Sequence, residues 1–599
     1  MDEECERAIE DHGIIGDMKT AALVATDGTI DFLCWPRFQS PSVIAAILDR
    51  RRGGAFELAP CLDDARHKQM YLPGTAILLT RFLSEGGVAE LSDFMAWGTA
   101  LPGQRLVRRA KAVRGRVRFR MRLDARPDYA RGRAAAGRDE TGAVVVRGGD
   151  GEAILRLVAQ VDVTVGEDGV VAADFELEHG ESAYFVLEHP DCPPLDDASA
   201  YVSAAFKETT NAWRAWSDRM TYRGRWRAAV ERSALTLKLM TSQEHGSIVA
   251  APTFGLPEAI GGTRNWDYRY VWLRDAAFTV YALIRVGHVE EANAFVAWLH
   301  RCSDSGVGEG PLGIVFGVDG HDDLAEEELP HLGGHRGSRP VRIGNDAAGQ
   351  LQLDVYGEVM DAVYLVDKYG RQISHEAWAG VRRALDWLGN NWERADEGIW
   401  EPRGGRREGL HSRLMCWVAF DRGLRLAAKR SLPAPEIEWR RIRDAIHDDI
   451  HANFWDADRG AFVQAKGSSH LDASCLLMPM VRFIAPTDPR WLSTLDAIGR
   501  ELTDDSLVFR YDQEAGDGID GAEGTFNMCS FWYVECLARA GDVAQARYLF
   551  DKMLGYANHL GLFAEETGPA GDQLGNFPQA FTHMALISAA VALDRALGA

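Results

Sequence analysis

Apolar and polar residues alternate along much of the first third of the chain. Residues 116–124 show the pattern most clearly, because their apolar side chains are separated by arginines. That spacing is typical of a β-strand with one buried face and one solvated face. Residues 21–35 and 75–97 each carry two apolar runs around an Asp-Gly or Gly-Gly turn, which predicts hairpins. We therefore expect residues 1–198 to form an antiparallel β-sandwich.

From residue 199 onward the apolar positions recur with the period of a helix. Residues 199–222 predict a linker helix, and residues 223–599 predict twelve further helical segments. Helices that alternate between an outer and an inner ring in this number form a six-fold α/α barrel. The predicted segments are 224–242, 271–287, 289–303, 352–369, 376–392, 411–429, 435–453, 472–483, 489–502, 526–540, 543–557 and 577–596.

This alternation predicts that the N-termini of the inner helices gather at one end of the barrel. The even-numbered segments are preceded or opened by "NWDYRYVWLRDAAF", "GIWEPRGGRREGLHSRLMCW" and "GLFAEETGPAGDQLGNFPQAFTH", among others. The odd-numbered segments begin with ordinary surface sequence such as "GHVEEANAF". One end of the predicted barrel is therefore rich in Trp, Arg, Asp and Glu.

Composition and charge exclude several function classes. The chain has 599 residues and a formal net charge of −22, which would repel nucleic acid and anionic membranes. It has no apolar run of the roughly 20 residues that a membrane span needs, and its acidic start does not resemble a secretory signal. We therefore expect a cytoplasmic protein. The nine cysteines contain no Cys-x-x-Cys motif, which favours reduced thiols.

An acidic, aromatic pocket without a phosphate-binding motif suits a neutral carbohydrate, since carboxylates and guanidinium groups bind neighbouring hydroxyls in pairs. Glycoside hydrolysis needs two carboxyl groups, and Glu358, Glu565 and Glu566 are the candidates that the pattern offers. Each could instead be a solvated charge, Arg274 and Asp275 could be a buried ion pair, and the tryptophans could belong to the core. No histidine cluster has the spacing of a metal site, so we expect none.

Several long motifs resemble glycoside hydrolase family 15, and the nearest branch is the bacterial trehalase-like and glucoamylase-like proteins. They include "LPEAIGGTRNWDYRYVWLRDAAF", "QLDVYGEVMDAVYL" and "EGTFNMCSFWYVECLA", in the family's order over nearly the whole chain. The resemblance implies a β-sandwich followed by an α/α barrel, and exo-hydrolysis of α-glucosides with inversion, releasing β-glucose. It implies no cofactor for that chemistry, although some trehalase-like members depend on phosphate and magnesium.

Carried over residue by residue, the resemblance places the general acid on Glu358 and the general base on Glu565. It places the pair that grips the terminal glucose on Arg274 and Asp275. Tyr356 would supply an apolar wall that raises the pKa of Glu358, and Glu566 would stand beside the base. The remaining residues that the resemblance implies for sugar binding are Trp272, Trp400, Glu401, Arg403 and, least firmly, Arg342.

The substrate stays open at this point. Trehalose is the first expectation, followed by an α-gluco-oligosaccharide of the isomaltose or nigerose type, or a glucosylated small molecule. A disaccharide phosphorylase and a non-catalytic sugar-binding protein remain as other classes, and the sequence leaves a homo-oligomer open. At seven positions the chain has a different residue from the one usual in this branch, so its specificity for the leaving group stays open. These positions are Gln39, Phe254, Gly255, Asp346, Arg413, Asn527 and His559.

Overall fold

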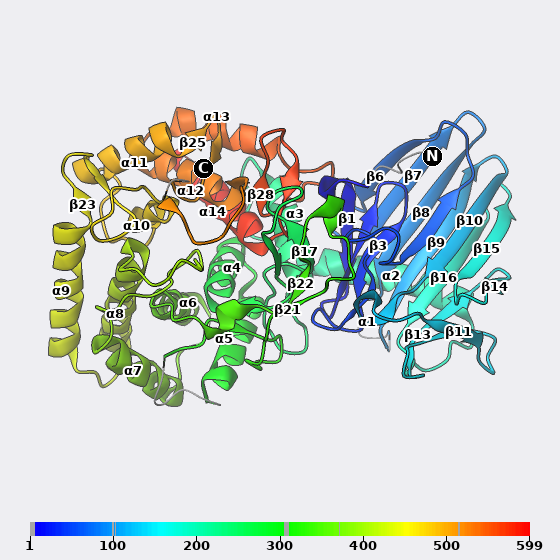
Figure 1. Cartoon of the computed structure of the whole chain (residues 1–599), viewed down its shortest axis with the longest axis horizontal. Helices are drawn as coiled ribbons and strands as arrows, with labels where there is room; N and C mark the ends of the chain where they lie inside the picture. The colour runs from blue at the N-terminus through cyan, green and yellow to red at the C-terminus, as the bar shows by residue number, and fades with distance from the viewer. Residues whose placement is uncertain are drawn as a thin grey trace.

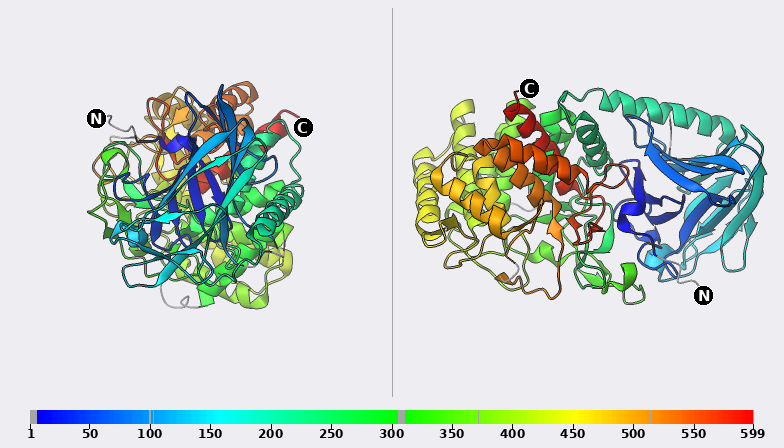
Figure 2. Two further views of the ribbon diagram at one scale, coloured as in Figure 1. Left: turned by 90° about the vertical axis from the view of Figure 1, so that its right-hand side faces the viewer. Right: turned by 90° about the horizontal axis from the view of Figure 1, so that it is seen from above.

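The computed structural model describes residues 6–98, 101, 103–304, 311–370, 372–512 and 515–598. It consists of a β-domain and a helical domain that lie side by side, with the N-terminal strands at one end and the barrel at the other (Figure 1). Helix α2 (Ala198–Ser217) runs along the β-domain and leads from it to the helical domain (Figure 2).

The β-domain is a sandwich of two antiparallel sheets, each with eight strands in the described part of the chain. The first sheet has the order β1 (His12–Gly16), β2 (Ala21–Ala25), β3 (Ile30–Cys34), β5 (Ala55–Pro60), β10 (Val117–Asp124), β15 (Val171–Leu177) and β14 (Thr164–Val165), with β4 (Ser42–Ile44) beside β3. The second has the order β11 (Ala135–Arg138), β12 (Val144–Arg147), β13 (Ala153–Ala159), β16 (Ser182–Glu188), β9 (Arg105–Arg114), β8 (Gly87–Met95), β7 (Leu78–Ser84) and β6 (Arg66–Tyr71).

Strand β10 shows why this sequence forms a sandwich. Its apolar side chains are buried in the core, while Arg118 and Arg120 on the other face are exposed. Burial of each large apolar side chain stabilises the fold by about 1.5–3 kcal/mol. The arginines of β9 behave differently, because Arg105 pairs with Glu188 at 2.5 Å and Arg108 pairs with Asp93 at 2.8 Å inside the domain.

The helical domain is the predicted six-fold α/α barrel. The outer helices are α3 (Arg227–Leu239), α5 (Val289–Asp304), α7 (His375–Gly389), α9 (Glu436–Asn453), α11 (Pro489–Glu501) and α13 (Val543–Leu554). The inner ring consists of α4 (Leu273–Val286), α6 (Val355–Tyr369), α8 (Leu410–Arg430), η4 with α10 (Ala473–Met480), α12 (Asn527–Ala540) and α14 (Ala580–Ala596). Each inner element contacts the next, and α14 closes the ring against α4.

The inner and outer helices differ in how many of their residues are buried. Helix α8 buries every residue from Leu410 to Leu424, whereas the outer helix α9 buries a single stripe of four residues that starts at Trp439. The fourth inner element is shorter than the predicted 472–483, because it begins as a 3-10 turn and contains Pro479, which cannot donate a helical hydrogen bond. No helix among the described residues has the length and apolar character that a membrane span requires. None of the eight described cysteines is in a disulfide.

Candidate active site

A pocket of about 350 Å³ opens at the barrel end where α4, α8, α12 and α14 begin, as the alternation of helices predicts. It brings together segments that lie far apart in the sequence, including strand β18 (Asn265–Asp267) and the loop before α8. Its charged and aromatic lining residues are Glu258, Arg264, Trp266, Tyr268, Trp272, Arg274, Asp275, Asp346, Glu397, Trp400, Glu401, Arg403, Arg510, Phe526, Glu565 and Phe581.

The first turn of α4 supplies an ion pair to this pocket. Arg274 donates from Nε to Asp275 Oδ1 at 2.9 Å and from Nη1 to the carbonyl oxygen of Ile399 at 2.6 Å. Burial raises the pKa of Asp275 to about 6, although the neighbouring guanidinium of Arg274 opposes that rise. This ion pair has the chemistry needed to bind two adjacent hydroxyls of one sugar ring.

Glu565 lies in the pocket with one oxygen held and the other free. Oε1 accepts hydrogen bonds from the hydroxyl of Tyr268 at 2.7 Å and from Nε2 of Gln579 at 3.2 Å. Oε2 is buried and has no hydrogen-bond partner among the described residues. Burial, followed by the nearby charge of Glu258, raises the pKa of Glu565, while the Tyr268 hydrogen bond lowers it. Gly575 has a φ of 75°, and a Cβ there would lie 2.6 Å from Oε2, so a side chain is excluded.

Glu401 is the second carboxyl group positioned for chemistry. Its Oε1 accepts from Trp272 Nε1 at 2.7 Å and lies 3.4 Å from Nη1 of Arg274. The residue has a φ of 54°, a conformation that non-glycine residues seldom adopt outside functional sites and tight turns. The rings of Tyr268 and Trp272 pack edge to face with centroids 5.3 Å apart. Glu401 and Glu565 are therefore each hydrogen-bonded to one member of an aromatic pair in the same pocket.

The structure does not bring Glu358 into this pocket. Glu358 lies inside α6, a turn below its first residue, and lines a separate cavity of about 40 Å³ together with Phe278 and Trp532. Its Oε1 is 3.7 Å from Nε2 of His411, and burial raises its pKa well above the ordinary value. Glu358, the expected general acid, therefore faces a different cavity from Glu565.

Two further expected residues lie outside the pocket lining for local reasons. Tyr356 is hydrogen-bonded through its hydroxyl to the backbone N–H of Leu312, and its ring stacks on Trp387 with centroids 5.4 Å apart. Arg342 is not among the lining residues, and its guanidinium carbon lies 4.9 Å from the ring centroid of Trp266. By contrast, Trp272, Arg274, Asp275, Trp400, Glu401 and Arg403 all line the pocket.

The adjacent glutamates Glu565 and Glu566 point to different surroundings, because successive side chains of extended backbone project to opposite sides. Glu566 begins the short strand β28 (Glu566–Thr567), and its Oε2 accepts from the backbone N–H of Gly524 at 2.7 Å. It is fully buried beside the pocket and does not line it.

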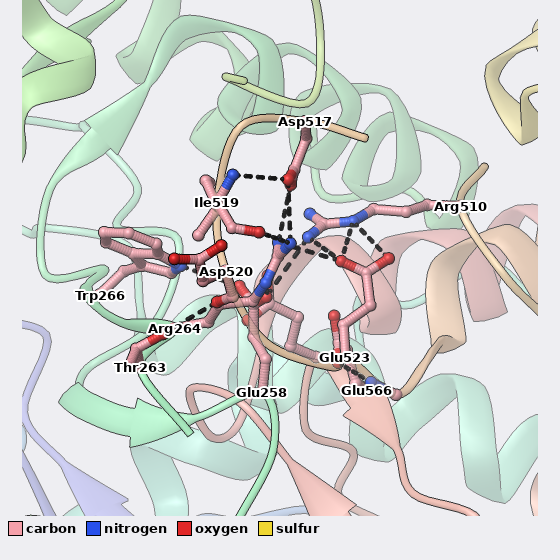
Figure 3. Close-up of polar contacts among 12 residues, drawn as sticks. Glu258, Thr263, Arg264, Trp266, Arg510, Asp517, Ile519, Asp520, Glu523 and Glu566 are labelled. Carbon is pink, nitrogen blue, oxygen red and sulfur yellow. Dashed lines mark hydrogen bonds and ion pairs between the residues drawn. The ribbon is translucent and has the colours of Figure 1, made fainter. Parts of the chain in front are cut away.

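Glu566 belongs to a buried network of carboxylates and arginines (Figure 3). Arg264 binds Asp517 at 2.8 and 3.0 Å, and Arg510 binds Glu523 at 2.5 Å. Among the described residues, Glu258, Glu523 and Glu566 are the one group of carboxylates close enough to share a cation, within 4.8 Å of one another. The guanidinium of Arg510 already contacts Glu258 and Glu523. We therefore interpret the group as an ion-pair network that fixes the pocket wall.

Most of the unusual residues noted in the sequence lie away from the pocket. Gln39 accepts a hydrogen bond from the backbone N–H of Val318, and His559 contacts Gln69 at 2.9 Å. Phe254 and Gly255 belong to the buried strand β17 (Phe254–Pro257), and Arg413 is buried among backbone carbonyls that include Glu393 O. Asn527 donates to Ala564 O at 3.1 Å. Only Asp346 among the seven lines the pocket.

Several pocket residues were not predicted from the sequence. Tyr268 and Trp266 lie within the quoted motif "NWDYRYVWLRDAAF", where alternation along extended backbone could have identified them. Glu258 and Gln579 also lie within quoted motifs, but nothing in their spacing singled them out. Arg510 comes from a segment that carries no signal of its own, and the closure of the barrel brings the three together.

Known proteins resemble the chain along its whole length. The model of glycosyl hydrolases family 15 matches residues 224–591, and the model of the trehalase-like N-terminal region matches residues 2–188. The chain is 38% identical over 98% of its length to a trehalase of Mycobacterium tuberculosis, of which the match covers 90%. It is 36% identical over 96% of its length to a trehalase of Thermoplasma acidophilum, of which 98% is covered.

The fold has a counterpart of known structure. A bacterial glucoamylase crystallised with acarbose superposes with a TM-score of 0.75 at 12% sequence identity, over 99% of this chain and 94% of the glucoamylase chain. Two family models, curated relatives and a shared two-domain fold thus agree with the pocket chemistry. The chain belongs to the trehalase-like branch of glycosyl hydrolases family 15 and is a glycoside hydrolase.

Proposed function

We propose that the protein hydrolyses trehalose with inversion of configuration at the anomeric carbon that is attacked. One observation carries the proposal: a single pocket holds two carboxyl groups, Glu401 and Glu565, together with the Arg274–Asp275 pair. Trehalose is the substrate that the names of the relatives in Mycobacterium tuberculosis and Thermoplasma acidophilum favour.

In the proposed mechanism, Arg274 and Asp275 bind hydroxyls of one glucose at the buried end of the pocket. Glu401, held by the indole N–H of Trp272, protonates the glycosidic oxygen as the general acid. Glu565 removes a proton through its free Oε2 from a water that attacks the anomeric carbon from the opposite face. An inverting enzyme needs roughly 6.5–9.5 Å between the two carboxyl groups, because the water and the sugar must fit between them.

The two carboxylates distinguish this proposal from a phosphorylase. Phosphate as the nucleophile would have to approach the anomeric carbon past Glu565, and the negative charge of Glu565 repels an anion. Phosphate also needs no general base, so Glu565 would have no role in a phosphorylase. The arginines that line the pocket are already paired, for example Arg264 with Asp517 and Arg510 with Glu523. Isomaltose, nigerose and glucosylated small molecules remain second candidates, because they present the same terminal α-glucose.

Proton NMR during the first minutes of trehalose hydrolysis tests the proposal. Inversion converts one glucose of trehalose to the β-anomer and releases the other as the α-anomer, so equal amounts of both are expected before mutarotation. Formation of α-glucose alone would contradict inversion. A parallel reaction with inorganic phosphate separates the phosphorylase alternative, which would produce glucose 1-phosphate. The same assay with isomaltose and nigerose ranks the substrates.

A further inference from the structure

The exposure of the lining residues shows which end of the pocket is buried and which end opens to solvent. Trp272 and Asp275 are buried, Glu401 and Trp266 are partly exposed, and Arg403 and Asp346 are exposed. A terminal glucose bound at the Arg274–Asp275 pair therefore leaves its glycosidic bond near Glu401. The leaving group must then extend outward, past Trp266, Arg403 and Asp346.

Trp266 is fixed in place at this outer end. Its Nε1 donates to Glu258 Oε1 at 2.9 Å, which sets the plane of the ring. The guanidinium carbons of Arg342 and Arg403 lie 4.9 and 4.6 Å from its centroid. Glu326 binds both arginines, at 3.2 Å to Arg342 Nε and 2.8 Å to Arg403 Nη2. Cation–π contacts and this shared carboxylate hold the indole as a rigid aromatic surface.

Asp346 presents a free carboxylate beside this surface. It opens the 3-10 turn η3 (Asp346–Gly349), which Asn345 caps by accepting the backbone N–H of Ala347 at 3.0 Å. The capping leaves the Asp346 side chain out of the backbone hydrogen bonding. No side-chain hydrogen bond or ion pair involves this carboxylate in the described part of the chain, and the residue is exposed on the pocket lining.

We propose that Trp266 and Asp346 form the binding site for the leaving sugar, and that Asp346 selects a neutral leaving group with adjacent hydroxyls. This inference rests on the proposed function and specifies the outer half of the same pocket. The part of the Trp266 indole that Arg342 and Arg403 leave exposed packs against the sugar, and the Asp346 carboxylate accepts hydrogen bonds from two of its hydroxyls. A phosphorylated leaving sugar is disfavoured by the charge of Asp346, and a leaving group without hydroxyls gains nothing from it.

Comparison of two substrates tests this assignment. Trehalose has a leaving sugar, whereas α-glucosyl fluoride has the same glucose with no leaving sugar. Asp346→Ala is expected to lower the ratio of kcat/KM for trehalose to kcat/KM for α-glucosyl fluoride by about 10- to 100-fold, the range for one or two hydrogen bonds to a charged group. Asp322→Ala, at an exposed aspartate outside the pocket lining, serves as the matched control and should leave the ratio unchanged.

The outcomes separate this inference from the proposed function. An unchanged ratio in Asp346→Ala, with wild-type protein active on both substrates, would overturn the leaving-sugar site alone. Wild-type protein that hydrolyses neither substrate would overturn the proposed function and this inference with it. A selective loss with trehalose would support both, and trehalose 6-phosphate should be the poorer substrate for wild-type protein and should gain relative to trehalose in Asp346→Ala.

Discussion

The hydroxyl of Tyr268 donates a hydrogen bond to Oε1 of Glu565 at 2.7 Å, while Oε2 of the same carboxylate is buried without a partner. One oxygen thus orients the group and the other is left for a water. The arrangement suits a general base, because the proton acceptor must be both held in position and unoccupied.

Tyr268→Phe should move the acidic limb of the pH profile to higher pH. Burial raises the pKa of Glu565, and the Tyr268 hydrogen bond opposes that rise by stabilising the carboxylate. A base acts only when deprotonated, so kcat/KM rises with pH through this pKa. Removal of the hydroxyl raises the pKa further, and kcat/KM measured from pH 4 to 9 should show the shift.

The matched control for that experiment is Tyr548→Phe, because Tyr548 is exposed on α13 and is not among the pocket-lining residues. Its profile should coincide with that of the wild type. An acidic limb in Tyr268→Phe that stays in place, or that moves to lower pH, would contradict the assignment of Glu565 as the base.

Glu565→Gln and Glu566→Gln should differ sharply although the residues are neighbours. Glu565→Gln removes the base, and kcat should fall by about 10²–10⁴-fold or more on trehalose and α-glucosyl fluoride alike. Glu566→Gln keeps a carbonyl oxygen for the Gly524 N–H and removes one negative charge from a buried acidic network. Its kcat should stay within about 10-fold of the wild type by the same scale. Similar losses in the two variants would show that the network, and not Glu565, controls turnover.

Asp396→Asn should flatten the pH dependence of stability. Burial and the nearby charge of Asp354 raise the pKa of Asp396 to about 7, and the side chain accepts from Leu353 N at 2.7 Å and Ser412 Oγ at 2.8 Å. In the folded state this carboxyl keeps its proton to about pH 7, while the unfolded chain loses it near pH 4. Its contribution to the free energy of unfolding is therefore complete below pH 4 and is lost as pH rises to about 7.

The size of that effect follows from the pKa difference, and is at most about 4 kcal/mol across the interval. Denaturant unfolding at pH 5 and pH 8 measures it in wild-type protein and Asp396→Asn. The amide has no charge to bury, so the variant should lose less stability than the wild type between the two pH values. An equal loss in both proteins would contradict the pKa assigned to Asp396.

The sequence predicts the framework well, because periodicity reports directly on burial. All twelve barrel segments appear in the structure, with one shortened at Pro479, and strand β10 has the exposed arginines that its alternation implies. The chemical asymmetry between the ends of the barrel also holds, since the pocket forms where α4, α8, α12 and α14 begin. The spacing of apolar residues and the order of the helices are sufficient to predict these features.

The pocket that each glutamate faces could not be predicted in the same way. Glu358 and Glu401 both lie near the start of an inner helix, and sequence proximity cannot tell a residue inside the first turns from one in the loop before them. In the structure Glu401 lines the pocket, whereas Glu358 lines a separate cavity. The contacts of Arg264 with Asp517 and Glu523 likewise span 253 and 259 residues, which no local pattern encodes.

We propose that Glu401, and not Glu358, protonates the leaving group. Measurement of kcat for Glu401→Gln and Glu358→Gln on trehalose and on α-glucosyl fluoride tests it most directly, because fluoride departs without a proton from the enzyme. Glu401→Gln should lose about 10²–10⁴-fold on trehalose and keep most of its activity on the fluoride, while Glu358→Gln shows no such difference between the substrates. Near-wild-type trehalose hydrolysis by Glu401→Gln, or the selective loss appearing in Glu358→Gln instead, would contradict the account.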